Sequence, residues 1–83
     1  MGVVKIRDDE IFERLDDVDM AIIEAYAASG MSVSRTARRA HYDRRTVSNR
    51  LTNIRLRVGV DPRDFKGLCQ LIKLIEEKGE TNG

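Results

Sequence analysis

The stretch RRAHYDRRTVSNRL, residues 38 to 51, contains five arginines in fourteen positions and a single acid, Asp43. An arginine guanidinium carries a permanent positive charge, and its fork of N–H donors matches the oxygens of a phosphate and the edge of a guanine base. The Asn, Ser and Thr side chains in the same stretch can bond other base edges. These residue types predict recognition of phosphates and bases.

A solvated helix surface is the alternative interpretation, and it is the commoner one for an arbitrary charged run. Such a surface normally mixes both signs, for example as Glu and Lys pairs four residues apart. In this stretch the only acid stands where the N-cap of a helix belongs. We therefore favour a surface that fits an anion.

The net charge of +1 conceals a strong polarity along the chain. Residues 8 to 24 contain eight acids and one arginine, whereas residues 35 to 57 contain eight arginines and one acid. Arginine rather than lysine in the basic segment favours bidentate recognition over plain solubility. The polarity also leaves a second class of function open, a protein–protein interaction module. Such a module would use its acidic and basic surfaces without binding DNA.

The length and composition exclude several classes of protein. Eighty-three residues suffice for one small domain, and 5% aromatic residues without Trp suit an all-α core of aliphatic side chains. One His, one Cys and scattered carboxylates offer neither a nucleophile–base pair nor a metal-ligand cluster, so we expect no enzyme, no metal and no cofactor. No apolar run approaches the roughly 20 residues of a membrane span, and no signal peptide is recognisable. The sequence predicts a cytoplasmic protein.

Hydrophobic spacing predicts a compact all-α bundle of four to five helices. A helical turn or two is expected within residues 9 to 15, and longer helices follow at about 17 to 29, 33 to 40, 44 to 58 and 64 to 78. The predicted N-caps are Asp16, Ser32, Asp43 and either Asp61 or Asp64. We expect an arm or short strand over residues 1 to 8, a helix-turn-helix domain over 9 to 78 and a disordered tail over 79 to 83.

The helices over residues 33 to 40 and 44 to 58 have the dimensions of a helix-turn-helix. The longer one is the predicted recognition helix, because its apolar stripe leaves an opposite polar face for the major groove of double-stranded DNA. At about 100° per residue, that face carries Arg45, Asn49 and Thr52, flanked by Arg44, Thr46 and Ser48. Phosphate contacts are expected from Arg35, Arg38 and Arg39, while Arg50 and Arg55 either contact phosphates or brace the helix.

The run SVSRTARRAHYDRRTVSNRLTNIRLRVGVDPRD resembles the C-terminal helix-turn-helix of bacterial transcriptional regulators of the PucR and CdaR type. The matching positions are Thr36, Ala37, Arg44, Thr46, Arg50, Leu51, Ile54, Gly59 and Asp61. The following DPRDFKGLCQLIKLI looks like the closing helix of that family, so the resemblance covers roughly residues 17 to 76. It implies a DNA-binding bacterial transcriptional regulator, associated with the nucleoid.

Three departures from the family pattern lie on or near the predicted reading surface. Asp43 replaces the usual His, Arg45 replaces the usual Asn, and Ser48 and Asn49 stand where larger residues are common. A different DNA sequence is therefore expected. The family's long N-terminal sensory region has no counterpart in this sequence.

The last helix has an apolar face that is wider than a small core needs. Phe65, Leu68, Ile72 and Ile75 are predicted to form its buried stripe. Leu71 and Leu74 lie beside that stripe, and Leu56 lies on the outward side of the recognition helix. Two interpretations remain open for these three leucines: burial against the rest of the monomer, for instance by residues 11 to 15, or homodimerisation.

Two reactive residue types have ordinary structural interpretations. His41 lies in the turn between the two helices of the motif and suits a positive φ better than most residues do. Cys69 has no second cysteine, so it is predicted to be a buried small hydrophobe. Tyr26 and Tyr42 are predicted to be packing residues.

Overall fold

The computed structural model describes residues 7 to 79, which form five α-helices and, within that range, no β-strand. The predicted all-α bundle is therefore confirmed. Most of the arm predicted for residues 1 to 8, and the tail after residue 79, lie outside the described residues. In chain order the helices are α1 (Asp8–Glu13), α2 (Asp17–Ala28), α3 (Val33–Ala40), α4 (Arg44–Val58) and α5 (Phe65–Gly79).

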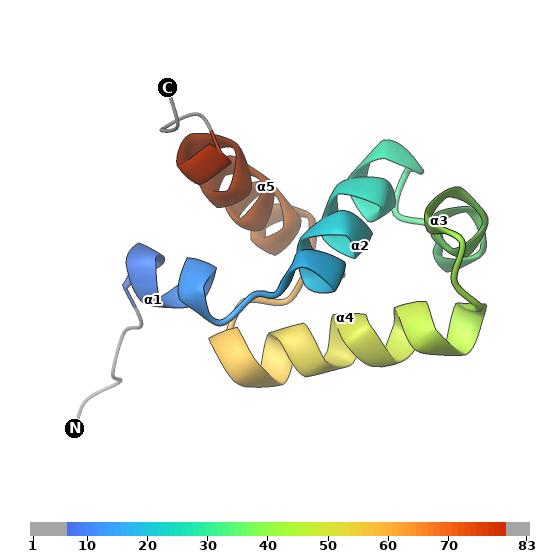
Figure 1. Ribbon diagram of the computed structural model, residues 1–83, viewed down its shortest axis with the longest axis horizontal. Coiled ribbons are helices and arrows are strands. Elements are labelled where there is room, and N and C mark those ends of the chain that lie inside the picture. The colour runs from blue at the N-terminus through green and yellow to red at the C-terminus, as the bar shows by residue number, and fades with distance from the viewer. Residues whose placement is uncertain (1–6, 80–83) are drawn as a thin grey trace.

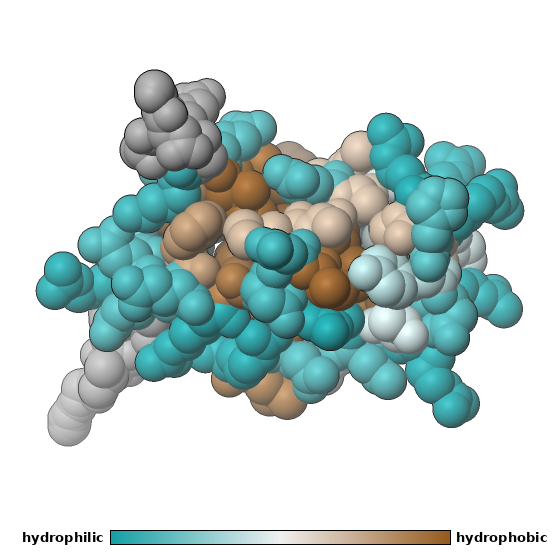
Figure 2. Space-filling view, in the orientation of Figure 1, coloured by the Kyte–Doolittle hydropathy of each residue, from teal (hydrophilic) through white to brown (hydrophobic). Residues whose placement is uncertain are grey.

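Helix α2 is the central element of the bundle. It contacts α3, α4 and α5, while α3 also contacts α4 and α1 contacts α5. In Figure 1, α4 forms one edge of the molecule and has α2 and α3 on its inner side. Figure 2 shows mostly hydrophilic side chains along that edge, whereas apolar side chains gather in the middle of the view, over α2 and α5.

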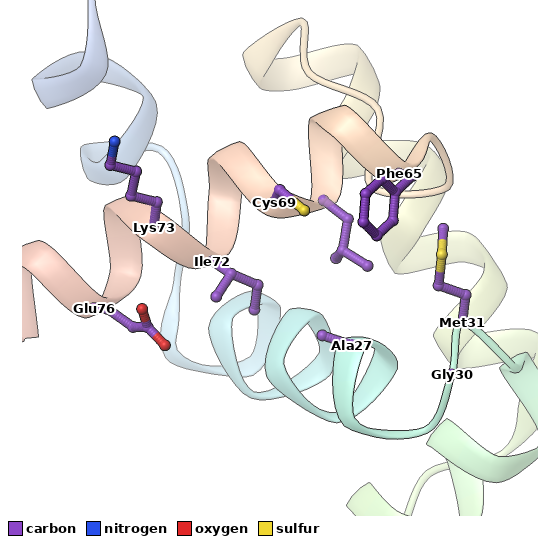
Figure 3. A pocket seen from close by; sticks show the side chains of 9 residues that line it. Ala27, Gly30, Met31, Phe65, Cys69, Ile72, Lys73 and Glu76 are labelled. Carbon is purple, nitrogen blue, oxygen red and sulfur yellow. The ribbon is translucent and has the colours of Figure 1, made fainter.

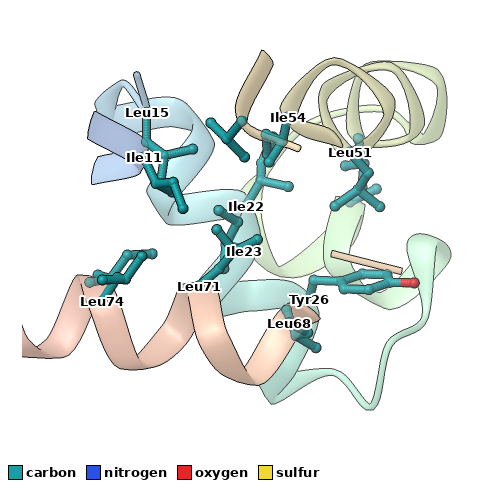
Figure 4. Close-up of a cluster of buried hydrophobic side chains, with 14 residues drawn as sticks. Ile11, Leu15, Ile22, Ile23, Tyr26, Leu51, Ile54, Leu68, Leu71 and Leu74 are labelled. Carbon is teal, nitrogen blue, oxygen red and sulfur yellow. The ribbon is translucent and has the colours of Figure 1, made fainter. Parts of the chain in front are cut away.

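The core is built from aliphatic side chains of all five helices, with Tyr26 at its side (Figure 4). The predicted stripe of α4 is confirmed, because Val47, Leu51, Ile54 and Val58 are at most 2% exposed. These residues return to one side of the helix every three or four positions, and burying each removes apolar surface from water. The stripe therefore fixes which side of α4 faces outward.

Side-chain caps set the helix starts, as the sequence predicts. The carboxylates of Asp16 and Asp43 each accept a hydrogen bond at 2.7 Å from the backbone N–H three residues later, and the Ser32 hydroxyl accepts one at 3.2 Å. For α5 the choice falls on Asp64, whose Oδ2 accepts from the Gly67 N–H at 3.1 Å. Each bond satisfies one of the donors that a helix start leaves free.

The predicted stripe of the last helix is partly wrong. Phe65 is 68% exposed, whereas Leu71 and Leu74 are 0% and 3% exposed and belong to the core. Figure 4 shows the reason: Leu74 faces Ile11 and Leu15, which α1 and the residues after it bring over α5. A dimer surface on Leu71 and Leu74 is therefore wrong, and the alternative of burial within the monomer holds for both.

Candidate nucleic-acid interface

The turn between α3 and α4 has the tight form that a helix-turn-helix requires. His41 ends α3 in the left-handed conformation, with φ at 64°, as its place in the sequence predicts. The N–H of Tyr42 then donates to the Ala37 carbonyl at 2.9 Å. Ala37 is small and 5% exposed, which lets neighbouring helices approach. The turn therefore holds the start of α4 beside α3.

The outward strip of α4, by which we mean Arg45, Asn49 and Thr52, lies opposite the buried stripe. Arg45 and Asn49 are exposed and Thr52 is half-buried. No hydrogen bond or ion pair to another described residue occupies the side chains of Arg45 and Asn49. Because these two side chains are exposed and unpaired, the strip presents a guanidinium and a carboxamide to the surroundings.

The residues that flank the outward strip differ in their exposure to solvent. Arg44 is exposed, while Thr46 and Ser48 are half-buried. The backbone N–H of Thr46 donates to Asp43, and this bond lowers the pKa of the Asp43 carboxyl below its usual 3.8. The cap therefore carries a negative charge at neutral pH at the first turn of α4.

Three arginines of α3 form a second basic surface. Arg35, Arg38 and Arg39 are exposed and line a polar hollow of about 650 Å³ together with residues 28 to 30 at the end of α2. None of the ion pairs among residues 7 to 79 involves them. Their charge is therefore available to an external anion.

Arg50 is held by the acidic start of α2. Its Nη1 donates to Asp16 at 3.0 Å and to Asp19 at 3.1 Å, and Arg57 donates to Asp19 at 2.7 Å. The Asp19 side chain is fully buried, whereas Arg50 and Arg57 stay 32% and 41% exposed. These contacts match the bracing role that the sequence left open for Arg50.

The charges of Asp16 and Arg50 are stabilised by their hydrogen bonds. The Asp19 N–H, and then the Arg50 guanidinium, lower the pKa of Asp16. Hydrogen bonds to Asp16 and Asp19 in turn raise the pKa of Arg50. Both shifts favour the charged forms of Asp16 and Arg50, and the ion pairs of Arg50 with Asp16 and Asp19 tie the start of α2 to α4.

Arg63 is a residue of this surface that helical spacing does not predict. It lies in the loop after α4, and its guanidinium donates to the Thr52 hydroxyl at 2.9 Å and to the Ser48 hydroxyl at 2.9 Å. The only available signal was its place in the DPRD run, next to a turn. Periodicity cannot place a loop side chain over a helix.

An apolar groove of about 410 Å³ lies between α2 and α5 (Figure 3). Figure 3 shows Phe65 and Met31 at one end of it and Lys73 and Glu76 at the other. Cys69 lines the groove and is exposed, so its predicted burial is wrong. The groove is separate from the outward strip, because none of its lining residues belongs to α4.

Among residues 7 to 79, no three His, Cys, Asp or Glu side chains are grouped so that they could hold a metal ion. No helix in this range combines the length and apolar character that crossing a membrane requires.

Comparison with known proteins gives one family. No curated protein and no solved structure matches the chain. The family match spans more than half of the sequence and contains all of α3 and α4, together with most of α2 and the start of α5. Residues 20 to 72 match the PucR C-terminal helix-turn-helix domain, and the chain therefore belongs to that family.

Proposed function

We propose that this protein binds double-stranded DNA in a sequence-specific manner and acts as a bacterial transcriptional regulator at the nucleoid. The observation that carries the proposal is the outward strip of α4, which is exposed directly opposite the buried stripe of a helix-turn-helix domain. A helix with one buried side and one polar side fits the major groove, where each base pair presents a distinct set of donors and acceptors.

The proposed roles follow from side-chain chemistry and exposure. Arg45 suits guanine O6 and N7, and Asn49 suits adenine N6 and N7. Thr52 and the flanking residues Arg44, Thr46 and Ser48 reach base edges or adjacent phosphates. Arg35, Arg38 and Arg39 neutralise phosphates and set the register of the protein on the duplex. Arg50 braces α4 through its ion pairs with α2.

A protein-interaction module is the weaker alternative. It would need the acidic segment of the chain to be free for a basic partner, but Asp16 and Asp19 already pair with arginines of α4. The internal pairs reduce the charge that a head-to-tail assembly would use. The unpaired arginines of α3 are better suited to phosphates, and a module that does not bind DNA would not use them in this way.

The test is equilibrium binding to duplex DNA at several salt concentrations, followed by selection of bound sequences from a random duplex library. We expect a log–log slope between about −4 and −6, because each neutralised phosphate releases counterions. Selection should yield a defined motif. Absence of binding to any duplex at about 50 mM salt would contradict the proposal. Binding without any selected motif would leave only non-specific association.

We also propose a homodimer, which would present two recognition helices to two half-sites about one helical turn apart. Of the three leucines first considered, Leu56 supports this, since it is 68% exposed. Phe65 is equally exposed but lies on α5, and it provides a matched control. In sedimentation equilibrium, Leu56→Ser should weaken self-association and Phe65→Ser should not. A monomeric wild type would contradict the dimer, and the reverse result would move the interface to α5.

A further inference from the structure

We propose that Arg63 is a positioning residue of the reading surface, which fixes the hydroxyls of Ser48 and Thr52 as outward hydrogen-bond donors. The inference rests on the proposed function and adds to it the kind of base edge that this part of α4 reads. Arg63 Nη1 lies 2.9 Å from Thr52 Oγ1, and Nη2 lies 2.9 Å from Ser48 Oγ and 3.1 Å from the Ser48 carbonyl. One guanidinium thus spans one turn of α4.

The direction of these hydrogen bonds is fixed by chemistry. A guanidinium has only donors, so each hydroxyl must use a lone pair to accept from Arg63 and keeps its own proton. Helical Ser and Thr often spend that proton on a carbonyl four residues earlier. Thr36 does so, donating to the Ser32 carbonyl at 2.6 Å. No such bond from Ser48 or Thr52 occurs among the described residues.

The two hydroxyl protons are therefore left for an external acceptor. In the major groove the acceptors are guanine N7 and O6, adenine N7 and thymine O4. A cytosine N4 amino group has only donors to offer there, so it cannot accept either hydroxyl proton. We infer that the base edges in contact with Ser48 and Thr52 are a purine N7, guanine O6 or thymine O4, and not a cytosine N4 amino group.

The backbone of Arg63 is held in place by Asp61. Its backbone N–H donates to Asp61 Oδ1 at 2.9 Å, which orders the loop. No carboxylate among the described residues forms an ion pair with its guanidinium. At about 100° per residue, Ser48 and Thr52 lie on one edge of α4, whereas Arg50 and Arg57 lie on the other. Arg63 therefore holds the edge that the acidic start of α2 does not reach.

The test is Arg63→Lys, which keeps the charge but replaces a bridging fork by a point donor. Affinity for the duplex selected by the wild type should fall about five- to tenfold, as for the loss of one oriented hydrogen bond. Affinity for a random duplex, and the salt slope, should stay unchanged. The matched control is Arg7→Lys, at an exposed residue directly before α1, and it should alter neither affinity.

A second variant separates orientation from charge. Thr52→Val removes one hydroxyl and should lower the affinity for the selected duplex by a similar factor. Adding Arg63→Lys to Thr52→Val should lower this affinity by less than Arg63→Lys does in the wild type. Equal losses on selected and random DNA would make Arg63 a simple phosphate contact and overturn the inference. An unchanged affinity of Arg63→Lys for the selected duplex would also overturn the inference. If the wild type itself selects no sequence, the proposed function fails, and the inference about Arg63 fails with it.

Discussion

The buried carboxylate of Asp19 joins the acidic start of α2 to the basic helix α4. Asp19 is fully buried and accepts hydrogen bonds from Arg50 and Arg57, and its Oδ2 also accepts from the Asp16 N–H at 3.2 Å. Without this carboxylate the Asp16 N–H would lose its acceptor, while Arg50 would keep only Asp16 and Arg57 only the Arg14 carbonyl. Removing one partner of a buried ion pair destabilises a protein by more than the intact pair stabilises it, because the remaining charges keep their desolvation cost without the compensating attraction.

Asp19→Ala should therefore lower the free energy of unfolding by about 2 to 3 kcal/mol. The estimate stays below that for a fully buried pair because both arginines are partly exposed. Chemical denaturation measures the change. Asp17→Ala is the matched control, since Asp17 is an exposed acid of the same helix turn, and it should cost less than about 1 kcal/mol. Equal losses in the two variants would contradict the role given to Asp19.

The cap of α4 makes a pH-dependent contribution to stability. The Thr46 N–H and hydroxyl lower the pKa of Asp43 below its usual 3.8, so the unfolded state binds a proton more readily than the folded state. The contribution is fully present above pH 3.8 and is lost as the pH falls through the lower, folded pKa. Asp43→Asn, which still caps but cannot titrate, should lose less thermal stability than the wild type on acidification.

The check is the thermal midpoint measured between about pH 5 and about pH 2. The curve of Asp43→Asn should be flatter than that of the wild type over the acidic part of this range. Gln70→Asn, an exposed change without a titrating group, should follow the wild type. Parallel curves for Asp43→Asn and the wild type would exclude a contribution from the Asp43 charge.

At the scale of helices, the sequence predicted boundaries well because caps and stops are local signals. The spans of α3 and α4 agree with their predicted limits, and Gly59 ends α4 with φ at 76°. The face of α5 was harder to predict, because burial there depends on α1 and not on periodicity alone. Leu74 is covered by Ile11 and Leu15, about sixty positions earlier, and periodicity within α5 does not contain that information (Figure 4).

Gly67 illustrates a second element-scale limit. Its position within α5 is unfavourable for helix propensity, yet a Cβ there would collide with the backbone carbonyl oxygen of Asp61. Glycine is thus required for the close approach of the loop to the first turn of α5. Sequence alone showed only the unfavourable propensity.

Gly67→Ala should destabilise the protein by about 1 to 3 kcal/mol, although alanine is the better helix former, because the loop must shift to admit the methyl group. Chemical denaturation gives the change directly. Gln70→Ala, at an exposed position of the same helix, should stay within about 0.5 kcal/mol of the wild type. A stabilised Gly67→Ala variant would show that the contact with Asp61 imposes no constraint.

At the scale of the whole molecule, the outward strip could be predicted because an apolar stripe defines its opposite face. Arg45 and Asn49 are exposed as that reasoning requires. The contacts of Arg50 and Arg63 could not be predicted in the same way. Each depends on a partner from another element, Asp19 in one case and the hydroxyls of α4 in the other.

The most direct test of the central claim compares Asn49→Ala and Arg39→Ala on the selected duplex and on a random one. Asn49→Ala should weaken binding to the selected duplex by about 1 to 3 kcal/mol and leave random binding nearly unchanged, because it removes a contact to one base pair. Arg39→Ala should weaken both alike, since a phosphate contact carries no sequence information. Equal losses on both duplexes for both variants would contradict a reading role for α4.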